Sequence, residues 1–147
     1  MSPERESEYA ELHAYLDFYS THISGIDPDN AIHPTNVGKR IVQQFGRSQA
    51  LDALKQAVND TVEELADRPA EYVQRLDASL RELGIITVSE IRRRYAASYK
   101  RILRRGKIKT ETEYYIIAGV LADFSSLATD EERTILDGLV ADYERGA

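Results

Sequence analysis

The sequence predicts an all-α protein, a multihelical bundle of about six or seven helices. Two observations predict this fold class. Apolar residues recur along most of the chain at the i, i+3, i+4 spacing of one helix face. Hydroxyl residues, prolines and glycines stand where these periodic segments would begin and end. No segment predicts a β-strand, although residues 85–86 and 107–109 suit short extended pieces.

The first half of the chain contains three predicted helices. The first is capped by Ser2, which precedes Pro3, and it ends before a loop at residues 24–35 that is rich in Pro, Gly, Asp and Asn. The second helix is short and stops at Gly46, and Ser48 suits the N-cap of the third. Their apolar stripes are Tyr9, Leu12, Leu16 and Tyr19, then Val37, Ile41, Val42 and Phe45, then Leu51, Leu54, Val58, Val62 and Leu65.

The second half contains four further predicted helices. Arg68-Pro69 interrupts the chain before a helix that ends at Gly84, a residue suited to the left-handed position after a helix. Three capping boxes mark the later starts, since each places a hydroxyl at the N-cap and a carboxylate at the third helical position. The pairs are Thr87 with Glu90, Thr110 with Glu113 and Thr129 with Glu132, and they predict helices near 88–105, 111–125 and 130–144.

The predicted helix 111–125 is apolar on every side, which is typical of the central helix of a bundle. Its small residues Ala118, Gly119 and Ala122 would let another helix approach closely. A role in lining a ligand site or forming a dimer is the alternative interpretation. We expect one helical domain over residues 1–147, with 1–3 and 144–147 frayed.

Composition excludes several classes of protein. With 42% hydrophobic and 30% charged residues, the chain is too apolar for a disordered protein. It has no cysteine, which excludes disulfides, thiolate metal sites and cysteine catalysis. No secretory signal follows Met1, and the longest apolar run, Tyr114 to Ala122, is too short to span a bilayer. We therefore expect a cytoplasmic protein without a membrane role.

Charge is strongly segregated along the chain. The protein carries 19 lysines and arginines against 25 acids, a formal net charge of -6. Nearly half of the cations stand between Arg92 and Lys109, a stretch without an acid. On a helical wheel, the predicted helix 88–105 has one apolar face and one cationic face. This predicts a basic patch on an acidic body. The candidate binding residues are Arg92, Arg93, Arg94, Lys100, Arg101, Arg104, Arg105, Lys107 and Lys109.

Nucleic-acid binding by a small non-catalytic, regulatory protein is the leading functional hypothesis. The helix that ends at Gly84, its short linker and the helix from Val88 resemble a helix-turn-helix in outline. In that arrangement Ser89, Arg92 and Arg93 would reach base edges, and the later cations would neutralise phosphates. Arginine predominates among them, and its guanidinium group binds phosphate or carboxylate with two hydrogen bonds.

Two other interpretations involve protein contacts. The cationic face could be an ordinary solvated face neutralised by acids of the same chain. Ordinary faces interleave acids, however, because like charges such as Lys100 and Arg104 at i, i+4 cost roughly 0.2–0.5 kcal/mol per pair. The alternative function is a protein-interaction or homo-oligomerisation module with an acidic partner surface. Candidate acids are Asp52, Asp60, Glu63, Glu64 and Asp67, and near the N-terminus Glu4, Glu6, Glu8 and Glu11.

An enzyme is the third hypothesis. His13, His22 and His33 are the three histidines, and together with carboxylates they could form a metal or acid–base site if the fold gathers them. No HExxH, P-loop, GxSxG or dinucleotide-binding motif is present. We therefore expect no catalytic residues, no metal and no cofactor.

Overall fold

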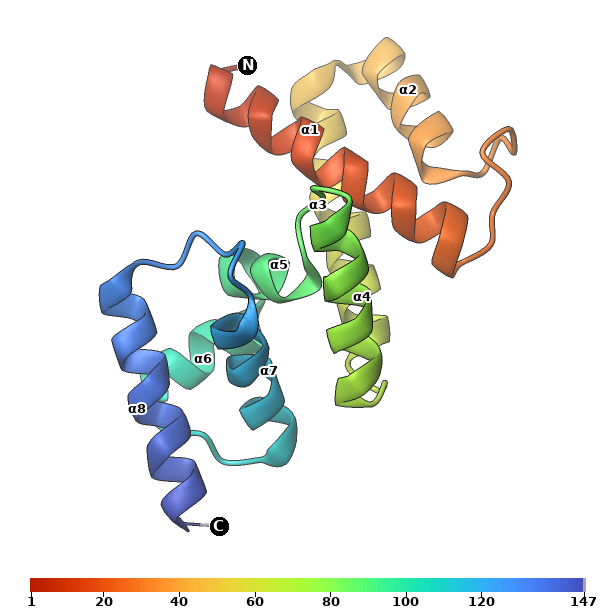
Figure 1. Ribbon diagram of the computed structural model, residues 1–147. Coiled ribbons are helices and arrows are strands. Elements are labelled where there is room, and N and C mark those ends of the chain that lie inside the picture. Colours follow the sequence, from red (N-terminus) through yellow and green to blue (C-terminus); the bar gives the residue numbers. More distant parts are fainter. Residues whose placement is uncertain (147) are drawn as a thin grey trace. The chain divides into compact units, whose positions relative to one another are not determined.

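The computed structural model describes residues 1–146, and it confirms the all-α prediction. In these residues the chain forms eight α-helices and one π-helical turn, with no strand (Figure 1). The predicted count of six or seven helices was therefore slightly low. The helices are α1 Pro3–Phe18, α2 Pro34–Phe45, α3 Arg47–Leu65, α4 Ala70–Glu82, α5 Val88–Tyr95, α6 Ala97–Arg105, α7 Glu111–Ala122 and α8 Asp130–Gly146, and the π-helical turn η1 is Tyr19–Ile23.

The additional helix arises because the segment predicted as one helix, 88–105, is broken at Ala96. Ala96 has extended backbone angles, φ -75° and ψ 128°, and it both ends α5 and precedes α6. No proline or glycine stands at this point, so local sequence does not impose the break. Ala96 is 7% exposed and belongs to an apolar core cluster, which indicates that packing sets its conformation. The prediction of a single helix was wrong here.

Most other predicted helix ends are confirmed. The amide of Arg5 donates to Ser2 Oγ at 3.2 Å, which caps α1. Gly46, with φ 90°, ends α2, and Gly84, with φ 70°, follows α4. Ser48 was wrong as a cap, because α3 begins directly after Gly46 and includes Ser48 in its first turn.

In each of the three predicted capping boxes, one of the two expected hydrogen bonds forms. Each threonine hydroxyl accepts a hydrogen bond from the amide three residues later, as predicted. The glutamate carboxylates instead bind arginines and other groups, described below. The hydroxyl partners are Thr87, Thr110 and Thr129, and the glutamates are Glu90, Glu113 and Glu132.

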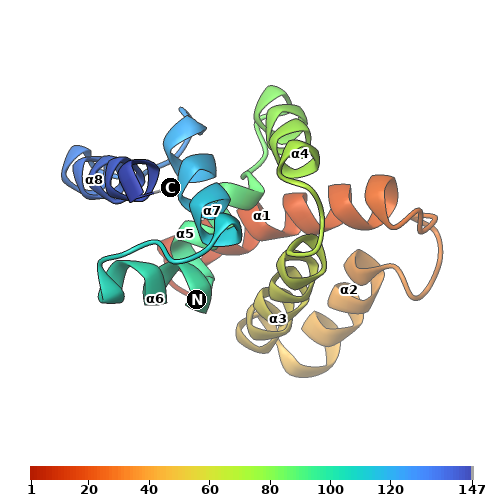
Figure 2. The ribbon, with the colours of Figure 1, turned by 90° about the horizontal axis from the view of Figure 1, so that it is seen from below.

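The helices group into two compact units. The first unit contains α1, α2 and α3, where α1 and α2 both contact α3 (Figure 2). Tyr15 of α1 is fully buried and its hydroxyl lies 2.8 Å from Thr61 Oγ1 of α3. Helix α2 contacts α1 and α3, but none of its residues is buried. The expectation of one domain over 1–147 stays a prediction, and Ala147, in the segment expected to fray, lies outside the described residues.

The second unit contains α4 to α8, and α7 contacts α5, α6 and α8 within it. Gly119 of α7 allows a close approach to α5, because a Cβ atom at this position would lie 2.8 Å from Ser89 Oγ. The prediction that a small residue of this helix lets another helix approach closely is therefore confirmed at Gly119. The core cluster of this unit consists of Ala96, Tyr99, Ile102, Ile108, Ile116, Ile117, Val120, Leu136 and Leu139.

Two glycine substitutions should have opposite effects on stability. Gly84 has a left-handed backbone and open space around its Cβ position, so Gly84→Ala should destabilise the fold by about 1 kcal/mol through backbone strain alone. Gly138 lies inside α8, also with open space, so Gly138→Ala should stabilise the fold by about 0.5–1 kcal/mol. Urea denaturation of both variants measures these differences. Equal signs would contradict the assigned backbone conformations.

Candidate binding surface

The nine cations predicted as binding residues occupy three different environments. Arg92 is only 8% exposed and takes part in the buried structure of α5. Arg93, Arg94 and Arg105 are partly buried and form ion pairs with glutamates. The remaining five are exposed, and residues 1–146 offer them no ion pair: Lys100, Arg101, Arg104, Lys107 and Lys109.

Glu90 neutralises the arginines at the end of α5. Its side chain is 3% exposed, and it accepts hydrogen bonds from Arg93 Nη2 and Arg94 Nε, both at 2.8 Å. Ser126 Oγ, in the connection between α7 and α8, donates at 2.7 Å. Burial by itself would raise the pKa of Glu90, but the hydrogen bonds from Arg93, Ser126 and Arg94 outweigh it and lower the pKa to about 2. Glu90 is therefore charged and fixed in place near neutral pH.

Glu132 and Glu113, at the third positions of α8 and α7, also pair with arginines. Glu132 of α8 accepts from Arg93 Nη1 at 3.1 Å and from the Tyr99 hydroxyl at 2.7 Å. Burial, followed by the nearby Glu132 carboxylate, raises the pKa of Tyr99, so its hydroxyl remains a donor. Glu113 of α7 pairs with Arg105 and accepts from the backbone amide of Lys109 at 2.8 Å. These bonds connect α5, α6, α7 and α8 to one another.

A buried aspartate, Asp77, organises the start of α5. Asp77 Oδ1 accepts from the Val88 amide at 2.8 Å, and Asp77 Oδ2 accepts from Ser89 Oγ at 2.5 Å. Burial raises the pKa of Asp77 despite these bonds. The sequence interpretation missed this residue, although a signal was present. Asp77 stands on the apolar stripe of its helix, one residue after Leu76 and three before Leu80.

A second aspartate, Asp123 at the C-terminal end of α7, accepts a hydrogen bond from Thr87, the N-cap residue of α5. Asp123 Oδ2 accepts from Thr87 Oγ1 at 2.5 Å, and Asp123 Oδ1 accepts from Arg81 of α4 at 3.1 Å. Burial opposes ionisation of Asp123, but hydrogen bonds from Ser125, Thr87 and Arg81 lower its pKa overall. The N-terminus of α5 is therefore enclosed by side chains of α4 and α7.

This enclosure corrects the helix-turn-helix interpretation. The turn between α4 and α5 exists, but Ser89 is 1% exposed and hydrogen-bonded to Asp77. Arg92 is also buried, and Arg93 is held between Glu90 and Glu132. A recognition helix must present the side chains of its first turns to a groove. The three residues expected to reach base edges are instead used within the protein.

The basic surface is the set of five exposed cations: Lys100, Arg101, Arg104, Lys107 and Lys109. The first three lie on α6, whose opposite face buries Tyr99 and Ile102. Gly106, with φ 74° and ψ 23°, ends α6 in the left-handed conformation and turns the chain toward α7. Ile108 is buried directly after this turn and separates the two exposed lysines.

A cavity of about 760 Å³ adjoins this end of the basic surface. Lys107 and Lys109 line it together with Leu139 and Tyr143 of α8. The tyrosine ring stacks on Tyr114, with centroids 5.3 Å apart. Asp142, which pairs with Arg145, also lines the cavity. Apolar and aromatic surface therefore lies beside two ammonium groups and one paired carboxylate.

The three histidines lie in different surroundings, all in the first unit. His33 is fully buried, and its Nδ1 accepts from the Thr35 amide at 3.2 Å, which caps α2. His22 is exposed and packs against Phe18, with ring centroids 5.0 Å apart. His13 lines a separate cavity. In the part of the chain that the structure describes, three or more His, Asp or Glu side chains nowhere gather around one possible ion position.

Comparisons with known proteins add no assignment. No protein-family model, no curated protein and no solved structure matches this chain. Within residues 1–146, no helix combines the length and the hydrophobicity needed to cross a bilayer. The function must therefore be argued from the surfaces described above.

Replacing Glu90 tests whether its carboxylate stabilises the fold by pairing with Arg93 and Arg94. Glu90→Gln should destabilise the fold by about 3 kcal/mol at pH 7, because it removes the buried carboxylate that Arg93 and Arg94 share and leaves Arg93 with Glu132 as its carboxylate partner. The folded-state pKa of Glu90 is below its ordinary value, so its stabilisation is present above pH 4.5 and is lost as the pH falls toward 2.

The difference in unfolding free energy between wild type and Glu90→Gln should therefore narrow between pH 4.5 and 2. Chemical denaturation at a series of pH values measures it. Glu131→Gln, at an exposed position of the first turn of α8, is the matched control and should change stability little. A difference that does not vary with pH would contradict the role given to Glu90.

Proposed function

We propose that this protein is a small non-catalytic binding protein that takes a polyanion on its basic surface, with a nucleic acid as the favoured partner. The observation that carries this proposal is the contrast between the two halves of the cationic stretch. On α5 the arginines are buried or paired with Glu90 and Glu132. On α6 and in the following turn, five cations are exposed, and no described carboxylate pairs with them.

The uncompensated cations carry an electrostatic cost. Lys100 and Arg104 stand at i, i+4 on α6, where two like charges cost roughly 0.2–0.5 kcal/mol. Arg101 and Arg105 have the same spacing, but Glu113 neutralises Arg105. An approaching anion would relieve the remaining repulsion, and displacement of its counterions would add to affinity. The exposed cations thus favour an anionic partner over an ordinary solvated face.

The cavity beside Lys107 and Lys109 favours a strand of nucleic acid among polyanions. Phosphate groups would contact the ammonium and guanidinium groups, while an unstacked base would enter the cavity against Leu139 and Tyr143. Helix α7 would serve as the centre of the bundle that holds this surface rigid. Its contacts with α5, α6 and α8 support that role.

Removing three charges of the basic surface tests the proposal. A variant with Lys100, Arg101 and Arg104 changed to Gln should bind a labelled single-stranded oligonucleotide more weakly. The slope of log affinity against log salt should become less steep by about 0.7 for each lost phosphate contact. Fluorescence anisotropy at several salt concentrations measures both quantities.

The control variant changes Lys39, Arg68 and Arg75 to Gln. It removes the same number of positive charges, at exposed positions outside the basic surface. It should retain most of the affinity and the slope. If the wild type shows no affinity at low salt, or if both variants lose it equally, the basic surface is not a nucleic-acid site.

The second candidate function is self-association through an acidic surface, and α3 supplies the observation that favours it. Asp60 and Glu63 are exposed on α3, and they accept hydrogen bonds from Gln56 and Asn59 but form no ion pair in residues 1–146. Of the acids near the N-terminus, Glu6 pairs with Arg47 and Glu8 pairs with Lys55. The outer face of α3 therefore complements the basic surface in charge.

Sedimentation velocity distinguishes this candidate. Self-association predicts a dimer at low ionic strength that dissociates as salt rises, because exposed charges are screened over about 10 Å at 0.1 M. Asp60→Asn with Glu63→Gln should abolish the dimer. Glu71→Gln with Asp137→Asn, also at exposed positions, is the charge-matched control and should not. A monomer at every salt concentration would exclude the candidate.

A further inference from the structure

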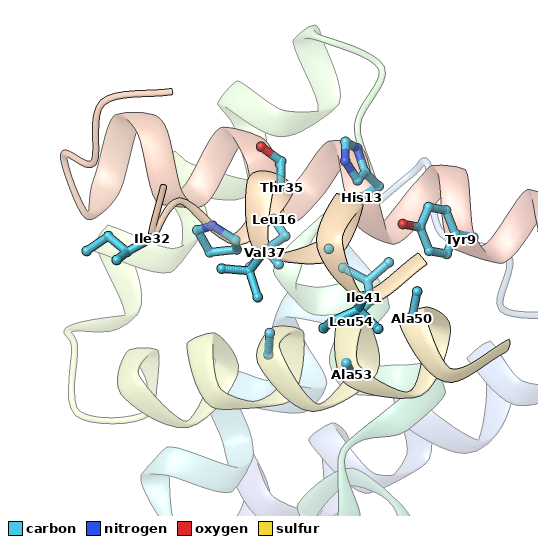
Figure 3. Close-up of a pocket in the computed structure, with 13 residues that line it drawn as sticks. Tyr9, His13, Leu16, Ile32, Thr35, Val37, Ile41, Ala50, Ala53 and Leu54 are labelled. Atoms are coloured by element: carbon cyan, nitrogen blue, oxygen red, sulfur yellow. The ribbon is translucent and has the colours of Figure 1, made fainter. Parts of the chain in front are cut away.

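The first unit contains an apolar cavity of about 230 Å³ between α1, α2 and α3 (Figure 3). Leu16 of α1, Val37 and Ile41 of α2, and Leu54 of α3 form much of its wall. Apolar atoms make up nearly all of the surface that lines it, and two polar rings, His13 and Tyr9, stand on the α1 side. The cavity is distinct from the basic surface, which lies in the other unit.

The cavity exists because small residues face it from two helices. Gly38 of α2, and Ala53 and Ala57 of α3, leave space that larger side chains would fill. A Cβ atom at Gly38 would meet nothing closer than Tyr9 Oη at 3.9 Å. Although α2 has a strongly apolar side, none of its residues is buried. Helix α2 therefore forms one wall of a cavity that is partly open to solvent.

The two polar rings have unused hydrogen-bonding capacity. The rings of Tyr9 and His13 stack with centroids 6.0 Å apart and 20° between their planes. Neither the Tyr9 hydroxyl nor the His13 imidazole forms a hydrogen bond with another residue in the part of the chain that the structure describes. Arg47 covers the Tyr9 ring from 4.6 Å and is itself held by Glu6. A ligand in the cavity would thus find an aromatic wall with a donor and an acceptor.

We propose that this cavity binds a small aromatic molecule that carries a single hydrogen-bonding group, of the size of indole or phenol. The volume sets the size, since an apolar cavity of about 150 Å³ accommodates benzene, and a peptide helix would not enter. The nearly apolar lining excludes a charged or highly polar ligand. Tyr9 and His13 set the orientation, because the ligand's polar group points to them and its ring lies against Val37, Ile41 and Leu54.

Indole and indene form a matched pair of probes, because they have the same shape and indene lacks the N–H donor. Titration followed by amide ¹H–¹⁵N spectra should give saturable shifts confined to α1, α2 and α3, with a Kd for indole on the order of 0.1–1 mM. Indole should bind about 2–10 times more tightly than indene. The variant His13→Leu with Tyr9→Phe should remove that difference while still binding both probes.

Filling the cavity should abolish binding. Ala57→Leu places a side chain in the cavity and should weaken indole binding about tenfold or more, whereas Gln56→Leu adds the same side chain at an exposed neighbouring position and should not. If Ala57→Leu fails to fold, Ala53→Leu provides the same test. The proposal is overturned if wild type shows no saturable shift up to the solubility of indole, or if a folded cavity-filling variant binds as wild type does.

Discussion

The buried carboxylate of Glu90 is the interaction on which the second unit depends. A carboxylate removed from water is tolerated only when it is paired and hydrogen-bonded. Arg93 and Arg94 supply the pairing, and Ser126 adds a bond from the connection between α7 and α8. Since Arg93 also contacts Glu132, one ionic cluster joins α5 to α8. Part of the most basic stretch of the chain is therefore structural.

The break at Ala96 separates this structural half from the exposed half. On α5 the polar atoms of Glu90 and Arg93 turn toward the interior of the unit, where Asp77 and Asp123 also close the helix start. On α6 the side chains of Tyr99 and Ile102 turn inward and Arg105 pairs with Glu113. Lys100, Arg101 and Arg104 of the same helix extend into solvent. One continuous helix would have kept all these charges on a single face. The break allows the same stretch to stabilise the fold and to present a charged surface.

Each unit has a surface feature whose polar or charged groups lack partners among the described residues. In the first unit, α2 forms one wall of a cavity whose polar rings, Tyr9 and His13, have no hydrogen-bonding partner among the described residues. In the second unit, the basic surface retains its mutual repulsion. A partner that completed either feature would gain free energy on binding, and the two ligands that we propose differ in kind. We propose a small aromatic molecule for the first and an extended polyanion for the second.

The sequence by itself determined the fold class and most helix ends, because these depend on contacts within a few residues. The hydroxyls of Ser2 and Thr87 each accept a hydrogen bond from the amide three residues later, and Gly84 adopts the left-handed conformation that follows a helix. Tertiary structure alone decided the break at Ala96 and the exposure of each cation. Burial and ion pairing join residues as far apart as Arg93 and Glu132, and helical periodicity says nothing about which distant carboxylate a guanidinium group will meet.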